Sequence, residues 1–211
     1  MTGPLFYAKI LLFGEYGIIK DSKGLAIPYN HYQGALKMES SPTQKTIDSN
    51  KNLQKFQKYL TTLTSDLVSF QLDMFQLDLD KGLYFDSSIP QGYGVGSSGA
   101  LVASIYDKYA EDKITVLENL TKEKLRKLKQ IFSLMESFFH GNSSGLDPLN
   151  SYLSLPILIN SSTNLEATGI PYQKNSKAAV FLLDSKMIGE TEPMVSIFMN
   201  KMKNEGFRKM F

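Results

Sequence analysis

Three alternating glycines followed by two serines constrain this chain more than any other feature. They lie in residues 89–101, IPQGYGVGSSGAL, and run directly into a helix that the pattern predicts over 97–109. Glycines at 92, 94 and 96 can adopt backbone angles closed to other residues, and the first amides of the helix attract anions. The segment therefore predicts a phosphate-binding loop. The alternative is a glycine-rich turn with Ser97 or Ser98 as the helix N-cap.

The spacing of this loop excludes the two commonest phosphate motifs. A Walker A loop requires a lysine after the glycines, and none follows here. The dinucleotide-binding motif is G-x-G-x-x-G, whereas these glycines follow G-x-G-x-G. The loop alone thus leaves its ligand open.

Composition limits the class of protein. With 211 residues and 42% hydrophobic side chains, the chain can form one full domain plus part of a second. Its 23 basic and 21 acidic residues are interspersed, which predicts neither a nucleic-acid nor a membrane partner. Cysteine is absent and histidine occurs twice, so we expect oxygen ligands for any metal. The N-terminal apolar stretch lacks a basic leader, and no run approaches the roughly 20 apolar residues of a membrane span, which predicts a cytoplasmic protein.

Hydrophobic periodicity predicts a sheet at the start of the chain. Residues 5–13, 17–19 and 25–39 are predicted to form paired strands. The spacing of apolar residues over 48–67 predicts an amphipathic helix. Two further strands, the second leading into the glycine loop, are predicted at 70–79, where apolar and polar side chains mostly alternate, and at 83–85.

The second half of the chain is predicted to be helical and then extended. Apolar residues over 117–139 trace one face of a helix or helix pair, Thr121 is a start signal, and we expect the basic run 122–129 to face solvent. A polar stretch at 173–177 is a candidate domain boundary. A hairpin, a buried strand and a helix are predicted at 152–159 with 165–172, at 178–184 and at 191–202.

Two carboxylates flank a turn in the stretch 136–148, ESFFHGNSSGLDP. Glu136 lies near the end of a predicted helix, and Asp147 follows a Gly/Asn/Ser loop just before a proline. The two can converge on one site, one as an oxygen ligand of Mg²⁺ and the other holding an acceptor hydroxyl. The alternatives are a solvated helix end for Glu136 and an ordinary turn for Asp147.

A lysine stands inside the apolar strand that Gly14 and Glu15 close. A buried lysine needs a partner, and Asp147 is the candidate for Lys9. The alternative is an edge-strand lysine that discourages aggregation.

Taken in order, the stretch KILLFGE, the glycine loop and the stretch HGNSSGLD resemble motifs of the GHMP kinases, and within that superfamily those of the mevalonate kinases. The resemblance implies that Asp147 is the catalytic carboxylate at the acceptor hydroxyl, supported by Lys9, and that Ser98 and Glu136 hold Mg²⁺ on ATP. It implies ATP contacts from Pro90, Gly92, Gly94, Val95, Gly96, Ser97, Ser98, Gly99 and Ala100. It implies contacts to the alcohol substrate from Glu15, His140, Ser144, Gly145 and Thr191.

The same resemblance implies an α+β fold in two parts. Residues 1–175 would form an ATP-binding domain like domain 2 of ribosomal protein S5, and residues 176–211 the start of an incomplete ferredoxin-like domain, so we expect the chain to be truncated. Tyr16 and Ser143 replace the family's usual His and Pro, which leaves mevalonate less determined than phosphoryl transfer. Phosphomevalonate, sugar or homoserine kinases, a nucleotide-binding remnant without turnover, and a homodimer stay open.

Overall fold

The computed structural model describes residues 3–63, 66–115, 119–161, 163–169, 181–184 and 191–209. Their fold is α+β, as predicted, with one antiparallel sheet and helices packed on it. The strands are β1 (Phe6–Phe13), β2 (Gly24–Met38), β3 (Leu83–Ser87), β4 (Ile157–Ile159) and β5 (Leu165–Ala167). The helices are α1 (Gln44–Thr62), α2 (Leu72–Asp80), α3 (Ser97–Tyr109), α4 (Lys122–His140), α5 (Leu146–Leu153), α6 (Thr191–Lys201) and α7 (Glu205–Arg208).

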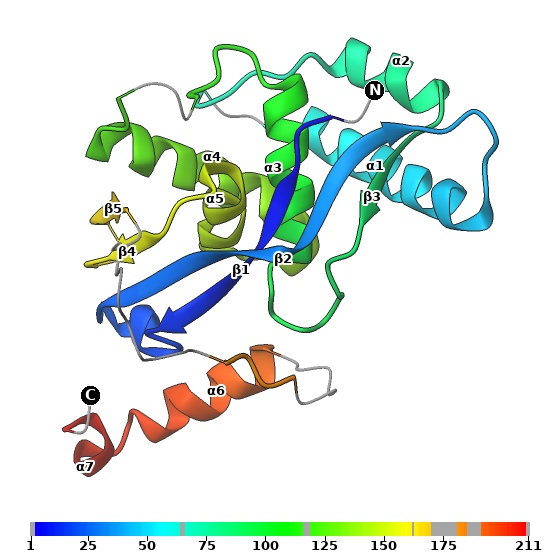
Figure 1. Ribbon diagram of the computed structural model, residues 1–211. Coiled ribbons are helices and arrows are strands. Elements are labelled where there is room, and N and C mark those ends of the chain that lie inside the picture. Colours follow the sequence, from blue (N-terminus) through cyan, green and yellow to red (C-terminus); the bar gives the residue numbers. More distant parts are fainter. Residues whose placement is uncertain are drawn as a thin grey trace, which may run out of the picture.

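The long strand β2 organises the sheet. β1 pairs along one edge of β2, whereas the other edge carries β4 beside the start of β2 and β3 beside its end. β5 extends the sheet beyond β4. In Figure 1, helices α1 to α5 lie on one side of the sheet, and α6 and α7 lie beneath it. The loop between β3 and α3, which contains the alternating glycines, therefore starts and ends next to the central strands.

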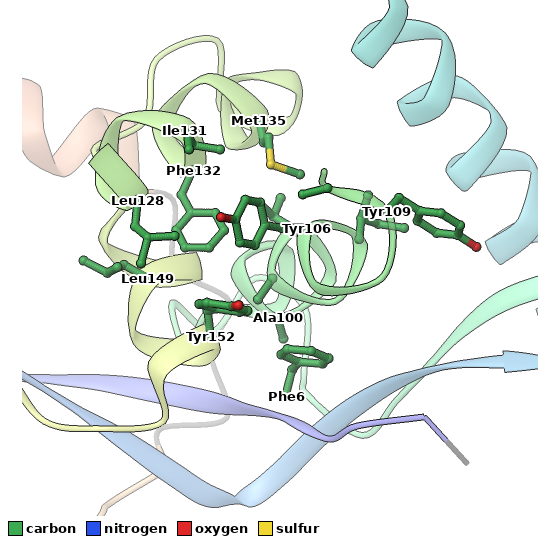
Figure 2. Close-up of a cluster of buried hydrophobic side chains, with 14 of the residues drawn as sticks. Phe6, Ala100, Tyr106, Tyr109, Leu128, Ile131, Phe132, Met135, Leu149 and Tyr152 are labelled. Atoms are coloured by element: carbon green, nitrogen blue, oxygen red, sulfur yellow. The ribbon is translucent and has the colours of Figure 1, made fainter. Parts of the chain in front are cut away.

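Helix α3 passes through the middle of the hydrophobic core. Its Tyr106 is 1% exposed and makes edge-on ring contacts with Phe132 of α4 and Tyr152 of α5, with centroids 5.0 and 5.1 Å apart. Figure 2 shows these rings together, with Ala100 on the opposite side of α3 near Phe6 of β1. The first turn of α3 is thereby fixed relative to β1, α4 and α5.

Most of the long predicted elements are confirmed, since they carry both periodicity and caps. The helix over 97–109 has the predicted bounds, and the 117–139 pattern forms the single helix α4, capped by the Thr121 hydroxyl. The basic run at the start of α4 is largely exposed, as expected. The 48–67 pattern forms α1, which starts earlier because Thr43 caps it and ends at Thr62. The 191–202 pattern forms α6.

The strand predicted over 70–79 is wrong, because residues 72–80 form helix α2. The segment in which apolar and polar side chains mostly alternate also has Leu72, Phe75 and Leu79 at helical spacing. Phe75 and Leu79 are buried. Tertiary burial thus decided between two periodicities that the short segment satisfies equally.

One further strand prediction is wrong, and another is contradicted over the residues that the structure describes. Residues 17–20 form a short 3₁₀ helix, η1 (Gly17–Lys20), because the backbone turns through positive φ at Gly14 and Tyr16. In the segment 178–184, the described residues 181–184 form no strand, and Phe181 and Leu183 are 89% and 92% exposed, since no described element covers them. The predicted domain boundary at 173–177 and the junction at 175 lie outside the described residues.

The hairpin predicted over 152–172 is confirmed but shorter. β4 and β5 pair antiparallel, whereas Tyr152 and Leu153 belong to helix α5. Beneath the sheet, α6 contacts the turn after β1 through Phe198, whose ring stacks on Tyr16 at 5.6 Å. Among the described residues, every helix is too short or too polar to cross a bilayer.

Candidate functional site

The glycine loop has the backbone conformation that its sequence predicts. Gly92, Gly94 and Gly96 adopt φ values of 77°, 67° and 82°, which other L-residues rarely adopt. Gly96 is the N-cap of α3, and in the described part of the chain no side chain caps this helix end. A serine N-cap is therefore wrong as an explanation of this loop. Because the first amides of α3 lack an internal partner, they are available to bind an anion.

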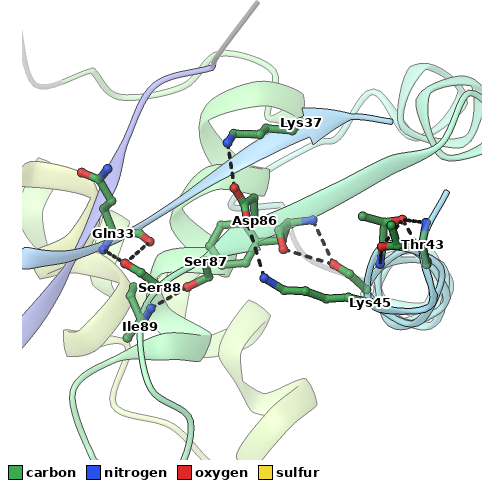
Figure 3. Close-up of polar contacts among 11 residues, drawn as sticks. Gln33, Lys37, Thr43, Lys45, Asp86, Ser87, Ser88 and Ile89 are labelled. Atoms are coloured by element: carbon green, nitrogen blue, oxygen red, sulfur yellow. Dashed lines mark hydrogen bonds and ion pairs between the residues drawn. The ribbon is translucent and has the colours of Figure 1, made fainter. Parts of the chain in front are cut away.

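Both ends of the loop are hydrogen-bonded to the sheet. At its start, the Ser88 hydroxyl accepts from the Gln33 amide at 3.0 Å and donates to the Gln33 carbonyl, as Figure 3 shows. At its end, the Lys9 amide donates to the Val95 carbonyl at 2.9 Å. Strands β2 and β1 thus hold the glycines in place, and Val95 acts as an anchor through its carbonyl.

The side chain of Lys9 pairs with Asp147. Lys9 Nζ lies 3.0 Å from Asp147 Oδ1, and the lysine side chain is only 12% exposed. A solvated edge-strand lysine is therefore wrong for this position. A Cβ added at Gly96 would lie 3.0 Å from Lys9 Cγ and 3.8 Å from Asp147 Oδ2. The end of the glycine loop, the lysine and the carboxylate thus meet at one point.

Asp147 lies in the first turn of helix α5. The loop position predicted for it from the proline that follows is therefore wrong. Proline is tolerated in a first helical turn because its missing N–H has no partner to lose there. Gly99 of α3 allows the two helix ends to touch, because its Cβ would lie 2.7 Å from the Asp147 carbonyl carbon. Two helix N-termini therefore point into the same region.

Glu136 is the buried acid of the site, so a solvated helix end is wrong for it. It is 3% exposed and accepts a hydrogen bond from the Ser98 hydroxyl at 3.1 Å on one oxygen and from the Ser143 hydroxyl on the other. Burial and, second, the negative charge of Asp147 raise the pKa of the Glu136 carboxyl to about 7, although these hydrogen bonds and the charge of Lys9 act to lower it. A cation beside Glu136 would offset the free-energy cost of ionising this buried carboxyl.

Ser143 is the residue that sequence reasoning missed. Its hydroxyl donates to Glu136 and accepts from the Gly145 amide at 3.1 Å. The available signal was the run of three small polar residues, 142–144, six to eight positions after Glu136. The Ser143 side chain is thus a hydrogen-bond donor to the buried acid.

The remaining predicted site residues differ in how close they lie to this cluster. His140 joins the cluster, because its Nε2 lies 3.1 Å from Ser98 Oγ. Ala100 is fully buried and Gly145 lies against the backbone of α4, so packing explains both positions. Pro90, Ser97 and Ser144 lie in or beside the two loops. Glu15 is exposed beyond the far end of β1, and the Thr191 side chain lies outside the described residues.

The oxygen donors at this site fit Mg²⁺. Ser98 and Glu136 come from adjacent helices and offer a hydroxyl and a carboxylate, the ligand type that this ion prefers. Mg²⁺ needs only one or two protein ligands, because phosphates and water complete its shell. Glu136 is 3% exposed and feels the negative charge of Asp147, so a positive charge is favoured there.

Comparison with known proteins finds similarity at the level of solved structures only. No protein-family model and no curated sequence matches the chain. Mevalonate kinase from L. major, in complex with R-mevalonate, matches over 82% of this chain and 54% of its own length, at 16% identity and a TM-score of 0.44. The Methanococcus jannaschii enzyme matches over 80% and 55%, at 14% identity and a TM-score of 0.45. The enzyme from methicillin-resistant Staphylococcus aureus matches over 77% and 53%, at 18% identity and 0.40.

The chain thus spans about half the length of these solved structures. At such identities and TM-scores the likeness carries no functional argument. The function is therefore argued from the geometry of the site.

Proposed function

We propose that this chain is an ATP-dependent kinase of the GHMP type, which transfers the γ-phosphoryl group of Mg·ATP to an alcohol. One observation carries the proposal: the Lys9–Asp147 ion pair lies against Gly96, where the glycine loop enters α3. An anion-binding loop and a carboxylate that can hold an acceptor hydroxyl are thereby brought within reach of one transferring phosphoryl group.

Each group has a role in this reaction. The loop amides and the end of α3 bind the phosphates, and Asp147 orients the acceptor hydroxyl and accepts its proton. Lys9 holds the carboxylate in place and balances its charge. Mg²⁺, held by Ser98 and Glu136, would neutralise charge on the phosphates. Catalysis then consists mainly of positioning and charge stabilisation.

Mevalonate is the first acceptor to test. Its support is the sequence HGNSSGLD, which delivers Asp147 and resembles the mevalonate kinase motif. Within this proposal, residues 1–175 form the ATP-binding domain and residues 176–211 begin a second domain.

The test is an ATP-consumption assay with mevalonate, phosphomevalonate, galactose and homoserine. We expect turnover with one of them. Asp147→Asn should lower kcat by about 10²–10⁴-fold, because the proton acceptor is lost, while ATP affinity stays within about threefold. The matched control is Asp80→Asn, an exposed carboxylate at the end of α2, which should leave kcat unchanged.

Two outcomes contradict the proposal. Normal turnover by Asp147→Asn would remove this carboxylate from the mechanism. Calorimetric binding of Mg·ATP without phosphorylation of any acceptor would favour a nucleotide-binding protein over a kinase.

A further inference from the structure

His140, Ser98 and Glu136 form a hydrogen-bonded chain between two helices. Glu136 and His140 are four residues apart on α4, so their side chains share one face of that helix. Ser98, in the first turn of α3, lies between them, with its Oγ 3.1 Å from Glu136 Oε1 and 3.1 Å from His140 Nε2. The serine hydroxyl therefore has a partner on each side.

The Ser98 hydroxyl carries a single proton, and this decides which group donates in each of its two hydrogen bonds. A serine hydroxyl has one proton to donate and two lone pairs. Both oxygens of Glu136 accept from serine hydroxyls, one from Ser98 and the other from Ser143, so the Ser98 proton is directed to Glu136. The second contact must then run from the imidazole to the hydroxyl oxygen, which requires the proton to be on Nε2. One lone pair of Ser98 is left over.

We propose that His140 is a positioning residue that orients the Ser98 hydroxyl toward Glu136, so that the remaining Ser98 lone pair is available to a divalent cation. This inference rests on the proposed function, in which Ser98 and Glu136 hold Mg²⁺. It makes His140 a partner of the metal ligand Ser98, in place of the predicted contact with the alcohol. Groups that orient metal ligands are typically worth 10–100-fold in metal affinity or activity.

Contacts of neighbouring residues fix the positions of His140 and Glu136. Gly141 ends α4 with φ 66°, and its amide donates to the Ser137 carbonyl at 2.8 Å, which fixes the backbone next to His140. The other oxygen of Glu136 is occupied by the Ser143 hydroxyl. Without the imidazole, Glu136 would stay oriented by Ser143, whereas the Ser98 hydroxyl would keep only its hydrogen bond to Glu136.

The hydrogen bond can be tested without any assay of activity. The chain has only two histidines, so ¹⁵N-edited NMR of the imidazoles gives two resolved systems. At pH 8.5 we expect His140 as the Nε2–H tautomer, which donates to Ser98. Ser98→Ala should shift the His140 Nε2 signal and leave that of His31 in place. An Nδ1–H tautomer, or a His140 signal insensitive to Ser98→Ala, would overturn the inference.

The positioning role is tested by metal dependence and rescue. The readout is the Mg²⁺ concentration that gives half-maximal ATP binding by calorimetry. His140→Leu should raise it about tenfold or more, whereas His140→Gln, whose amide can donate from the same place, should stay within about threefold of the wild type. His31→Leu is the matched control and should change nothing.

The outcomes separate this inference from the proposed function. If His140→Leu and His140→Gln raise the half-maximal Mg²⁺ concentration equally, the positioning role is overturned, whereas the proposed kinase function is unaffected. A wild-type chain that binds no Mg·ATP would overturn the proposed function and with it the metal part of the inference.

Discussion

At the scale of single residues, Glu136 is the feature that stability alone does not explain. A buried carboxylate beside a second carboxylate costs free energy, and the two serine hydroxyls and Lys9 offset only part of it, since the pKa is still raised to about 7. A glutamine or an apolar residue would fill the same space at a lower cost. A group retained against stability in this way is typical of a functional site.

The pKa of Glu136 predicts how stability depends on pH. The carboxyl titrates near 4.5 when unfolded and near 7 when folded, so the folded chain binds the proton more tightly. Its contribution to the free energy of unfolding is fully present below pH 4.5 and is lost as pH rises through 7. Glu136→Gln removes this loss and should be more stable than the wild type by roughly 3 kcal/mol at pH 8, but by only about 1 kcal/mol at pH 5.

Urea denaturation of both proteins at pH 5 and pH 8 measures the effect. Glu123→Gln, an exposed position on the same helix α4, is the matched control and should differ from the wild type by under about 0.5 kcal/mol at either pH. Equal stabilisation by Glu136→Gln at both pH values would show that the carboxyl is not neutral at pH 5.

At the scale of elements, helix α2 offers the sharpest test of the fold. Phe75 is fully buried and stacks on Tyr109 of α3 with centroids 4.4 Å apart, whereas Leu77 is 58% exposed. In a strand, these two residues would share a face. Phe75→Ala should therefore destabilise the chain by about 3–5 kcal/mol and Leu77→Ala by under about 0.5 kcal/mol, measured by urea denaturation. Similar losses for both would support the strand that alternation alone predicts.

The elements also show where sequence patterns suffice. α3 and α4 are long, their apolar residues follow one period, and Thr121 caps α4, so local signals agree with tertiary burial. α2 has nine residues, too few to separate the two periods. α5 begins with Gly145 as its N-cap and has Pro148 in its first turn, and both residues are equally typical of a loop.

For the candidate site, too, sequence patterns predicted one part and not the other. The types and spacing of its residues were predicted from three local motifs, because phosphate and metal chemistry require glycines, hydroxyls and carboxylates. Which of them touch depends on packing between helices. The approach of α3 to α5 at Gly99 brings Asp147 to Lys9, and the single-turn offset along α4 brings His140 to Ser98. Those contacts required the folded chain.

At the scale of the whole molecule, the site exists only when the domain is folded. Its groups come from β1, the glycine loop, α3, α4 and α5, which are distant in sequence and meet through one hydrophobic core. An unfolded chain cannot gather these groups, so a ligand of the site binds the native state alone. Ligand binding and global stability are therefore linked.

This linkage gives a test of the nucleotide loop that needs no acceptor. Mg·ATP at 100 times its Kd should add about 2.7 kcal/mol to the free energy of unfolding, which raises the Tm by roughly 5–10 °C for a chain of this size. Gly94→Val should abolish the rise. Its Cβ would meet no described atom within 4 Å, but a β-branched residue is strained at φ 67°, so the loop must change conformation.

Two matched variants separate loop conformation from other causes of a lost thermal shift. Gly94→Asn should keep most of the rise in Tm, because asparagine tolerates the left-handed region that the loop requires at this position. Asp147→Asn should also keep it, since that carboxylate faces the acceptor and not the phosphates in the proposed reaction. Differential scanning calorimetry with and without Mg·ATP compares all four proteins. If Gly94→Val keeps the full rise, nucleotide does not bind at the glycines, and Asp147 faces them for a reason other than phosphoryl transfer.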